Sequence, residues 1–338
     1  MRRIARAVLA ALVLAASPPP GEEREISFDR YDPLSSNQVL AQRLMPPLEV
    51  DQTFRDLARR RQVFRDQPVE LAAESFRIFV PAQRPAAGYG LLVFVPPWQG
   101  AQIPPAWRGV LDRKGIIMVT AARSGNAEPV LGRRDPLAML AAINVKARYP
   151  VDPARVYVGG FSGGSKVAFK LAVGYPDLFA GALLLAGADP VGEDGFTFPS
   201  AQLFDRFRAN SRIVFVTGAR DEINVRLADS AAASIRRACA RTAAKLSVPG
   251  LGHELVDSGW LLRALNALDG APPRLDPASQ KCRSELDTRI AAELDAVAAL
   301  IARGDRAQAR KDLLRIDARF GGLALPRSLA LLRQIDGV

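Results

Sequence analysis

The chain has 338 residues, of which 49% are hydrophobic and 24% are charged, with a formal net charge of +11. This balance is that of a globular protein able to bury a full core, and it excludes a disordered or fibrous chain. The arginines are spread along the chain rather than gathered in one basic tract with interleaved aromatic residues, so a nucleic-acid partner is not indicated.

The N-terminus has the layout of a secretory signal. A basic segment at 1–6 leads into an apolar run at 7–16, followed by Ser17 and three prolines. This order predicts a signal peptide at 1–17 and a periplasmic or secreted protein. Stable membrane insertion is not expected, because a helix that crosses a bilayer needs about 20 apolar residues and prolines end this run early.

From residue 68 onward, short β-rich runs alternate with amphipathic stretches such as 136–149 and 165–175. The strand candidates lie at 75–80, 91–95, 116–119, 155–158, 182–185, 213–216 and 245–248. Strands that alternate with helices predict βαβ units and a mostly parallel sheet. Reactive groups in such sheets gather at the carboxyl ends of the strands, so the residues just after each run are the place to search.

The regions outside this alternating part differ in composition. A polar arm carries no motif that predicts a role, and a proline-rich linker precedes a helical appendage with helices expected at 284–302, 306–320 and 327–335. This appendage is expected to offer a surface for protein contacts. The predicted organisation is a signal peptide at 1–17, an arm at 22–67, a catalytic domain at 68–270, a linker at 271–283 and the helical appendage at 284–338.

A serine lies in a glycine-rich turn between a predicted strand and a predicted helix. Gly160-Phe161-Ser162-Gly163-Gly164 fits the pattern G-x-S-x-G of a nucleophile elbow. In such a turn Gly160 and Gly164 keep Cβ atoms out of crowded positions, and the turn lifts the Ser162 hydroxyl above the sheet edge. The Gly163 amide, at a helix N-terminus, is placed to donate to an oxyanion.

A serine hydroxyl needs a base to take its proton, and the chain contains one histidine, His253. It lies in a glycine-flexed loop after the last predicted strand. Asp221 is the leading candidate for the acid that orients this histidine, because it follows the strand at 213–216 and keeps the chain order Ser, Asp, His. Asp189 is the second choice; Glu222 and Asp257 are rivals.

The elbow around Ser162, the segment 217–221 and the Gly252-His253 loop resemble the α/β-hydrolase superfamily, over residues 69–269. Within it the chain is similar to the exported esterase and polyhydroxybutyrate-depolymerase-like group. The resemblance implies an α/β-hydrolase fold and acyl transfer from a small-molecule or polymeric ester by a Ser-His-Asp triad, without cofactor or metal. A peptidase or amidase of the same fold, or an inactive binding protein, are the alternatives.

The loop expected to complete the oxyanion hole departs from a common pattern. Many lipases and esterases carry His-Gly-Gly-Gly here, whereas this chain has Pro96-Pro97-Trp98-Gln99-Gly100. Proline has no N–H to donate, so Trp98 or Gln99 is expected to supply the second donor. The Trp98 indole could wall the acyl pocket or be an ordinary packed aromatic side chain.

Two further features leave alternatives open. The phenylalanine-rich stretch between Asp189 and Arg212 could form a small cap over the site or contain one ordinary crossover helix at 202–209. Cys239 and Cys282 are predicted to pair, because disulfides persist in exported proteins. The alternative is two unrelated buried thiols.

Overall fold

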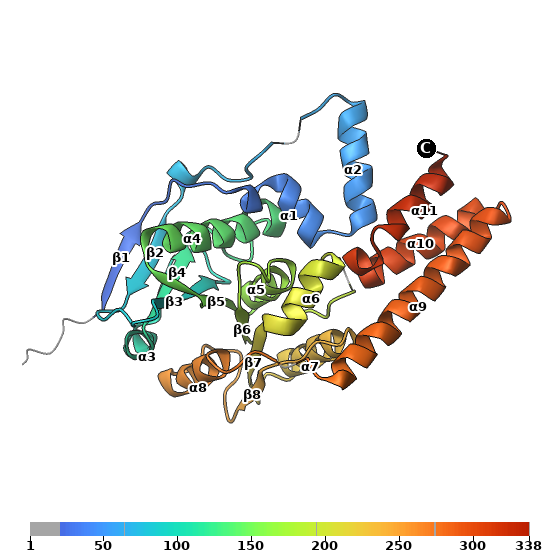
Figure 1. Cartoon of the computed structure of the whole chain (residues 1–338). Coiled ribbons are helices and arrows are strands. Elements are labelled where there is room, and N and C mark those ends of the chain that lie inside the picture. Colours follow the sequence, from blue (N-terminus) through green and yellow to red (C-terminus); the bar gives the residue numbers. More distant parts are fainter. Residues whose placement is uncertain (1–20, 64, 194, 274, 338) are drawn as a thin grey trace, which may run out of the picture.

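A computed structural model describes residues 21–337 except 64, 194 and 274. Its centre is an eight-stranded sheet with the order β1-β2-β4-β3-β5-β6-β7-β8 (Figure 1). Strand β2 is antiparallel to both neighbours, and every other pair is parallel. The strands are β1 (Glu22–Ile26), β2 (Phe76–Val80), β3 (Tyr89–Val95), β4 (Ile116–Ala121), β5 (Val151–Phe161), β6 (Gly181–Leu185), β7 (Arg212–Gly218) and β8 (Ala244–Val248).

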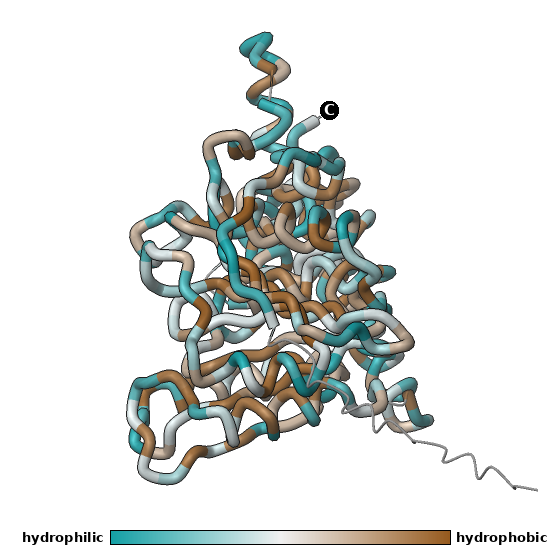
Figure 2. The backbone as a smooth tube through the Cα atoms, turned by 90° about the vertical axis from the view of Figure 1, so that its left-hand side faces the viewer, coloured by the Kyte–Doolittle hydropathy of each residue, from teal (hydrophilic) through white to brown (hydrophobic). Residues whose placement is uncertain are grey.

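Helices cover both faces of this sheet. One face packs against α3 (Arg108–Lys114) and α8 (Ser258–Leu268), and the other against α4 (Asp135–Arg148), α5 (Gly163–Gly174) and α7 (Glu222–Arg237). Along β3 the buried side chains alternate between the two cores: Leu91 and Val93 join one, Leu92 and Phe94 the other. This period of two places apolar side chains on both faces, which is why the strands read as continuous apolar runs. Figure 2 shows these hydrophobic segments inside the molecule.

The strand order and the serine-bearing turn after β5 are those of the predicted α/β-hydrolase fold, and all seven predicted strands are present. Strand β1 was not predicted. Its sequence, EEREI, is mostly charged, and charged side chains suit a strand at the edge of a sheet, where they discourage pairing with another chain. The predicted arm thus adds a strand to the sheet.

The rest of the arm and the connections form short elements. The arm contains η1 (Pro33–Ser35), α1 (Asn37–Leu44) and α2 (Pro47–Arg59), and the connections contain η2 (Leu71–Ala73), η3 (Pro105–Trp107) and the π-turn η4 (Val130–Arg134). In the described part of the chain no helix combines the length and the apolar character needed to cross a bilayer. The predicted signal peptide at 1–17 lies outside the described residues.

The C-terminal appendage consists of α9 (Pro277–Ala302), α10 (Arg306–Phe320), η5 (Gly321–Ala324) and α11 (Arg327–Asp336), drawn in orange and red beside α2 in Figure 1. Helix α9 begins inside the stretch 271–283 that we predicted as linker, because Asp276 caps it by accepting a hydrogen bond from Ser279 N at 2.8 Å. The predicted pairing of Cys239 with Cys282 is confirmed, with Cα atoms 5.8 Å apart. This disulfide ties the end of α7 to α9.

The segment between β6 and β7 holds a loop and one crossover helix, α6 (Ala201–Asn210). Of the two alternatives for this segment, the structure has the single helix. Phe198, Phe204 and Phe207 are buried in the core rather than arranged as a cap. The loop before α6 lies against the appendage, because Gly322 N donates to Phe198 O at 2.8 Å.

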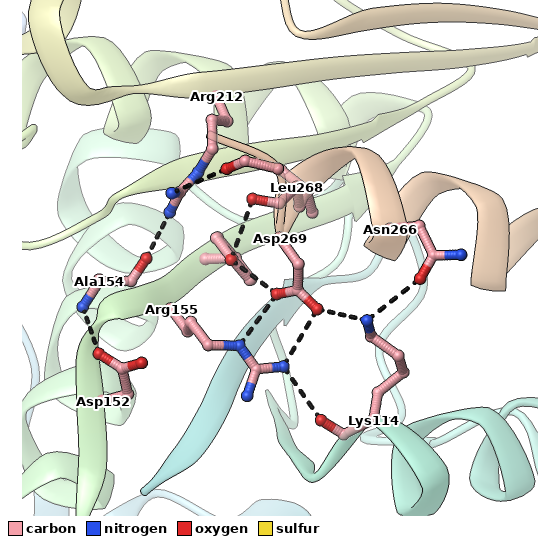
Figure 3. Close-up of polar contacts among 10 residues, drawn as sticks. Lys114, Asp152, Ala154, Arg155, Arg212, Asn266, Leu268 and Asp269 are labelled. Carbon is pink, nitrogen blue, oxygen red and sulfur yellow. Dashed lines mark hydrogen bonds and ion pairs between the residues drawn. The ribbon is translucent and has the colours of Figure 1, made fainter. Parts of the chain in front are cut away.

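An ionic network holds the amino ends of several strands (Figure 3). The carboxylate of Asp269, after α8, accepts from Arg155 Nε at 2.9 Å and from the Tyr157 hydroxyl at 2.9 Å. Lys114 Nζ lies 2.5 Å from the other oxygen. This network lies at the amino ends of β4 and β5, whereas Ser162 follows the carboxyl end of β5, so the network belongs to the sheet's scaffold.

Candidate active site

The backbone around Ser162 forms a strained turn. Ser162 has φ +54° and ψ −124°, in a region that costs a non-glycine residue about 1–3 kcal/mol. A Cβ at Gly160 would lie 2.3 Å from the Gly164 carbonyl carbon, and a Cβ at Gly164 would lie 1.9 Å from Val95 O. Both glycines therefore have the steric role predicted from the G-x-S-x-G spacing.

The structure brings the three predicted triad residues together. His253 Nε2 lies 3.0 Å from Ser162 Oγ, and His253 Nδ1 lies 2.6 Å from Asp221 Oδ2. Ser162 follows β5, Asp221 follows β7 and His253 follows β8, so three strand ends at one edge of the sheet supply the constellation. At these distances the imidazole can take the proton of the serine hydroxyl while the carboxylate orients the imidazole.

The hydrogen bonds fix the tautomer of the histidine. Because the carboxylate can only accept, Nδ1 of His253 carries the proton that is donated to Asp221, and Nε2 is left to accept from the Ser162 hydroxyl. Asn224 Nδ2 donates to both carboxylate oxygens of Asp221, at 3.0 and 2.9 Å. Its 3.1 Å contact with His253 Nδ1 then joins two donors and is not a hydrogen bond.

Asp221 is kept ionised by its partners. Its side chain is 8% exposed, against 44% for His253. Burial alone would raise its pKa, but the hydrogen bonds from His253 and Asn224 outweigh burial and hold the pKa of Asp221 below its ordinary value. The carboxylate is therefore charged near neutral pH and can stabilise an imidazolium on His253.

Backbone contacts between loops set the position of the histidine. Gly218, the last residue of β7, lies so close to the histidine loop that a Cβ there would be 2.3 Å from Leu251 O. Arg220 N donates to Leu251 O at 3.0 Å, and Ala219 N donates to Val248 O at 2.9 Å. The segments that carry the acid and the base are thus bonded to each other directly.

The other carboxylates considered from the sequence lie elsewhere. Asp189 pairs with Lys166 Nζ at 2.7 Å. Glu222 is exposed and lies 3.6 Å from Arg226, while Asp257 caps α8 by accepting from the Trp260 amide at 2.9 Å. None of the three has a hydrogen bond to His253 among the described residues, which leaves Asp221 as its carboxylate partner.

The region of the predicted oxyanion hole is built from two loops. The Gly163 amide is at the first position of α5, where an N–H has no partner within the helix. The loop at 96–99 is held by Asn126 N, which donates to Pro97 O at 2.9 Å, and by Arg123 N, which donates to Gln99 O. Which of Trp98 and Gln99 donates to an oxyanion stays a prediction.

The Trp98 ring is part of a row of aromatic rings that ends at His253. Its centroid lies 6.3 Å from that of Phe161, and the Phe161 centroid lies 4.9 Å from the His253 ring. The indole Nε1 of Trp98 is buried and has no hydrogen-bond partner among the described residues. Trp98 thus packs against Phe94 and Phe161 as part of the core on this face of the sheet, and Phe161 separates it from His253.

Sequence reasoning missed three residues at this site. Asn224 fixes the acid, and the only sequence signal is its place three residues after a helix-capping aspartate. Asn126 is exposed and lies beside the N-terminus of α5, because a Cβ at Gly163 would be 2.3 Å from Asn126 Oδ1. A side-chain amide at this place can donate an additional hydrogen bond to an oxyanion. Gly187 leaves room for the elbow, since a Cβ there would lie 2.4 Å from Ser162 O.

The described residues contain no group of three or more His, Cys, Asp or Glu side chains that could hold a metal ion.

Comparisons with known proteins give a short sequence match and distant structural ones. No family model matches the chain. Over 44 residues it is 50% identical to a poly(3-hydroxyalkanoate) depolymerase C from Paucimonas lemoignei, a match that covers 13% of this chain and only 11% of that protein.

Solved structures of esterases and peptidases share part of the architecture. A feruloyl esterase module from Clostridium thermocellum is 15% identical with a TM-score of 0.44, over 58% of this chain and 82% of that chain. A poly(3-hydroxybutyrate) depolymerase from Bordetella parapertussis is 17% identical with a TM-score of 0.43, over 62% and 88%. A puromycin-hydrolyzing peptidase from Mycobacterium tuberculosis is 18% identical with a TM-score of 0.41, over 57% and 36%. These values are too low to indicate which bond the chain cleaves.

Proposed function

We propose that the protein is a serine hydrolase that cleaves a carboxylic ester through an acyl-enzyme on Ser162. The observation that carries this proposal is the continuous hydrogen-bonded row from Ser162 Oγ through His253 to Asp221. A strained, glycine-flanked serine with a base at 3.0 Å has the arrangement needed to activate a hydroxyl for attack.

The proposed first half-reaction forms the acyl-enzyme. Ser162 Oγ bonds to the ester carbonyl carbon while its proton passes to His253 Nε2, and Asp221 stabilises the imidazolium. Charge develops on the carbonyl oxygen, which receives hydrogen bonds from the Gly163 amide and from Trp98 N–H or Gln99 N–H. The bond to the alcohol oxygen then breaks, and His253 gives its proton to the leaving alcohol.

The second half-reaction returns the free enzyme. A water molecule attacks the acyl carbon and passes a proton to His253, the bond to Ser162 Oγ breaks, and His253 returns the proton to that oxygen. No electron donor or acceptor enters either half. The chemistry of the triad is therefore complete without a cofactor.

An ester is favoured over an amide by one observation outside the triad. The 44-residue match is to a depolymerase whose name specifies a polyester, poly(3-hydroxyalkanoate). A peptidase or amidase would use the same three residues, so the substrate class must be measured. A panel of 4-nitrophenyl esters and aminoacyl anilides separates the two, and faster cleavage of the anilides would reject the ester assignment.

Covalent labelling tests whether the fold is catalytic. A fluorophosphonate probe should label the wild-type chain and the Ser230→Ala control, whose substituted serine is exposed on α7, but not Ser162→Ala. Asp221→Asn should lower kcat by about 10⁴-fold, because the imidazole loses the partner that fixes its tautomer. Folded wild-type protein that takes up no label would favour a binding protein on a hydrolase fold.

Export is part of the proposal. The basic and apolar segments at 1–16 have the order of a secretory signal, and the disulfide between Cys239 and Cys282 requires an oxidising compartment to persist. Intact-mass measurement of the chain recovered from periplasm and medium should show loss of the segment at 1–17. Recovery of the uncleaved chain with two free thiols from the cytoplasm would reject export.

A further inference from the structure

A pocket of about 320 Å³ lies beside the nucleophile, along the first two turns of α5. It reaches Gly163, the residue after Ser162, and the residues that line it come from α5, η4 and the loop before α6. Its described lining consists of Val130, Arg134, Gly163, Lys166, Val167, Lys170, Asp189, Gly195 and Phe196. The volume is in the range of pockets that take small ligands.

The pocket combines apolar walls with cationic side chains that are spaced along α5. Positions 163, 166, 167 and 170 share one face of α5, because residues three, four and seven apart lie on the same side of a helix. Val167, Val130 and Phe196 supply apolar walls. Lys166 and Lys170 lie about 4.5 and 10 Å along the helix axis from Gly163, given a rise of about 1.5 Å per residue.

The charges in this pocket are not balanced. Lys166 is paired with Asp189, the one carboxylate among the described lining residues. Arg134 is buried and donates to the carbonyl oxygens of Ser124 and Pro96 at 2.9 and 3.0 Å. Lys170 is half-buried and has no ion pair or hydrogen bond among the described residues, so its ammonium group is left for a ligand.

One buried carboxyl group near Lys170 does not cancel its charge. Asp135 follows the lining residue Arg134 in the chain and interacts electrostatically with Lys170. Burial raises the pKa of Asp135 to about 7, so this group carries only part of a negative charge at neutral pH. Lys170 therefore keeps an excess of positive charge facing the pocket's apolar walls.

The side of Ser162 on which the pocket lies indicates which part of an ester would occupy it. The leaving alcohol must receive its proton from His253 Nε2, so it lies toward the histidine loop. No residue of that loop lines the pocket, which instead begins at Gly163 on the side of the expected oxyanion donor. The acyl part is thus the part that can extend along α5.

We propose that this pocket binds the acyl part of an ester whose far end carries a carboxylate, with Lys170 as its counter-ion. The proposal rests on the proposed ester hydrolysis and specifies its substrate class: monoesters of dicarboxylic acids and other esters with an acidic acyl end. The carboxylate lies within roughly 10 Å of the scissile carbonyl carbon, because Lys170 is about 10 Å from Gly163 along the helix axis.

A matched pair of substrates tests this assignment. Mono-4-nitrophenyl adipate and 4-nitrophenyl hexanoate share the leaving group and the acyl chain length, and differ in the terminal carboxylate. We expect wild-type kcat/KM to favour the adipate, and 1 M NaCl to reduce this preference, because the Debye length then falls to about 3 Å.

Three charge variants determine which residue sets the preference. Lys170→Gln should lower the ratio of the two kcat/KM values by about three- to fivefold, the size expected of one partly exposed ion pair. Asp189→Asn should raise the ratio, because it frees Lys166. Lys281→Gln removes the same charge from exposed α9 and should leave the ratio unchanged.

The outcomes separate this proposal from the proposed function. A wild-type enzyme that cleaves both esters equally well, or a ratio that Lys170→Gln leaves unchanged, would overturn the carboxylate site at Lys170 while leaving ester hydrolysis intact. If neither ester is cleaved and the fluorophosphonate probe does not label Ser162, the proposed function itself fails. Should Lys170→Gln not fold, Lys170→Met removes the same charge, keeps a long apolar side chain and is measured in its place with the same expected result.

Discussion

Asp135 should make the protein less stable as the pH rises toward neutrality. It is the first residue of α4, its side chain is fully buried, and neither carboxylate oxygen has a hydrogen-bond partner among the described residues. Burial raises the pKa of this group from 3.8 to about 7, although Lys170 and Arg134 oppose the shift. The folded protein therefore binds a proton at Asp135 more tightly than the unfolded chain does.

The sign and the size of the effect follow from this difference. Asp135 opposes folding least below about pH 4, where it is protonated in both states, and its cost grows as the pH rises to about 7. A pKa difference of about three units corresponds to about 4 kcal/mol in the free energy of unfolding. In Asp135→Asn this cost is absent, because the amide stays neutral at every pH.

Urea denaturation of the wild-type protein and Asp135→Asn at pH 4.5, 6 and 8 measures this difference. At pH 4.5 the variant should be more stable by only about 1 kcal/mol, because Asp135 is still protonated in the folded protein and a protonated carboxyl group and an amide bury similar polar groups. At pH 8 the variant should be more stable by up to about 4 kcal/mol. A difference that does not change with pH would show that Asp135 does not titrate in this range.

Three further variants should change stability or turnover. Asp269→Asn should have the opposite pH dependence. Burial raises the pKa of Asp269, but the hydrogen bonds from Arg155 and Lys114 outweigh burial and hold this pKa below its ordinary value. The free energy of unfolding of the variant should therefore be lower by about 3 kcal/mol at pH 7, and by less as the pH falls, in the same urea assay. Asn224→Ala should lower kcat by about tenfold with little change in melting temperature, because it removes hydrogen bonds that hold the acid; an unchanged kcat would deny Asn224 this role. Cys282→Ser should lower the free energy of unfolding by about 4 kcal/mol for a loop closed over 43 residues, and an unchanged melting temperature would show that packing alone holds the appendage.

The fold was predictable because its strands are buried on both faces. Continuous apolar runs such as 91–95 and 116–119 give a strong signal, and the alternation with helices fixes the sheet as parallel. Strand β1 gives no such signal, since an edge strand with one neighbour can be built from charged residues. The start of α9 was predicted too late, because the prolines before residue 278 indicated a linker. Asp276 and Pro277 are in fact the N-cap and a first-turn residue of the helix.

The juxtaposition of Ser162, His253 and Asp221 was predictable because each of them follows a strand, in a fixed chain order. The remaining parts of the site depend on contacts between distant segments. Nothing near Asn126 in the sequence indicates that it lies beside Gly163, and the pocket exists only where α5 meets η4 and the loop before α6. Such features follow from tertiary packing, which a local pattern cannot show.

The C-terminal helices are physically connected to the proposed acyl pocket through the loop at 189–200. That loop supplies Gly195 and Phe196 to the pocket on one side, and on the other its residue Phe198 accepts a hydrogen bond from Gly322 N. The approach is close, because a Cβ at Gly192 would lie 2.6 Å from Arg319 O. No residue of α9, α10 or α11 lines the pocket in the described part of the chain, so an effect of the appendage on the pocket would have to pass through this loop. The disulfide also ties α9 to α7, the helix that Asp221 caps, so the appendage is connected both to the loop of the proposed pocket and to the helix that begins at the proposed triad acid.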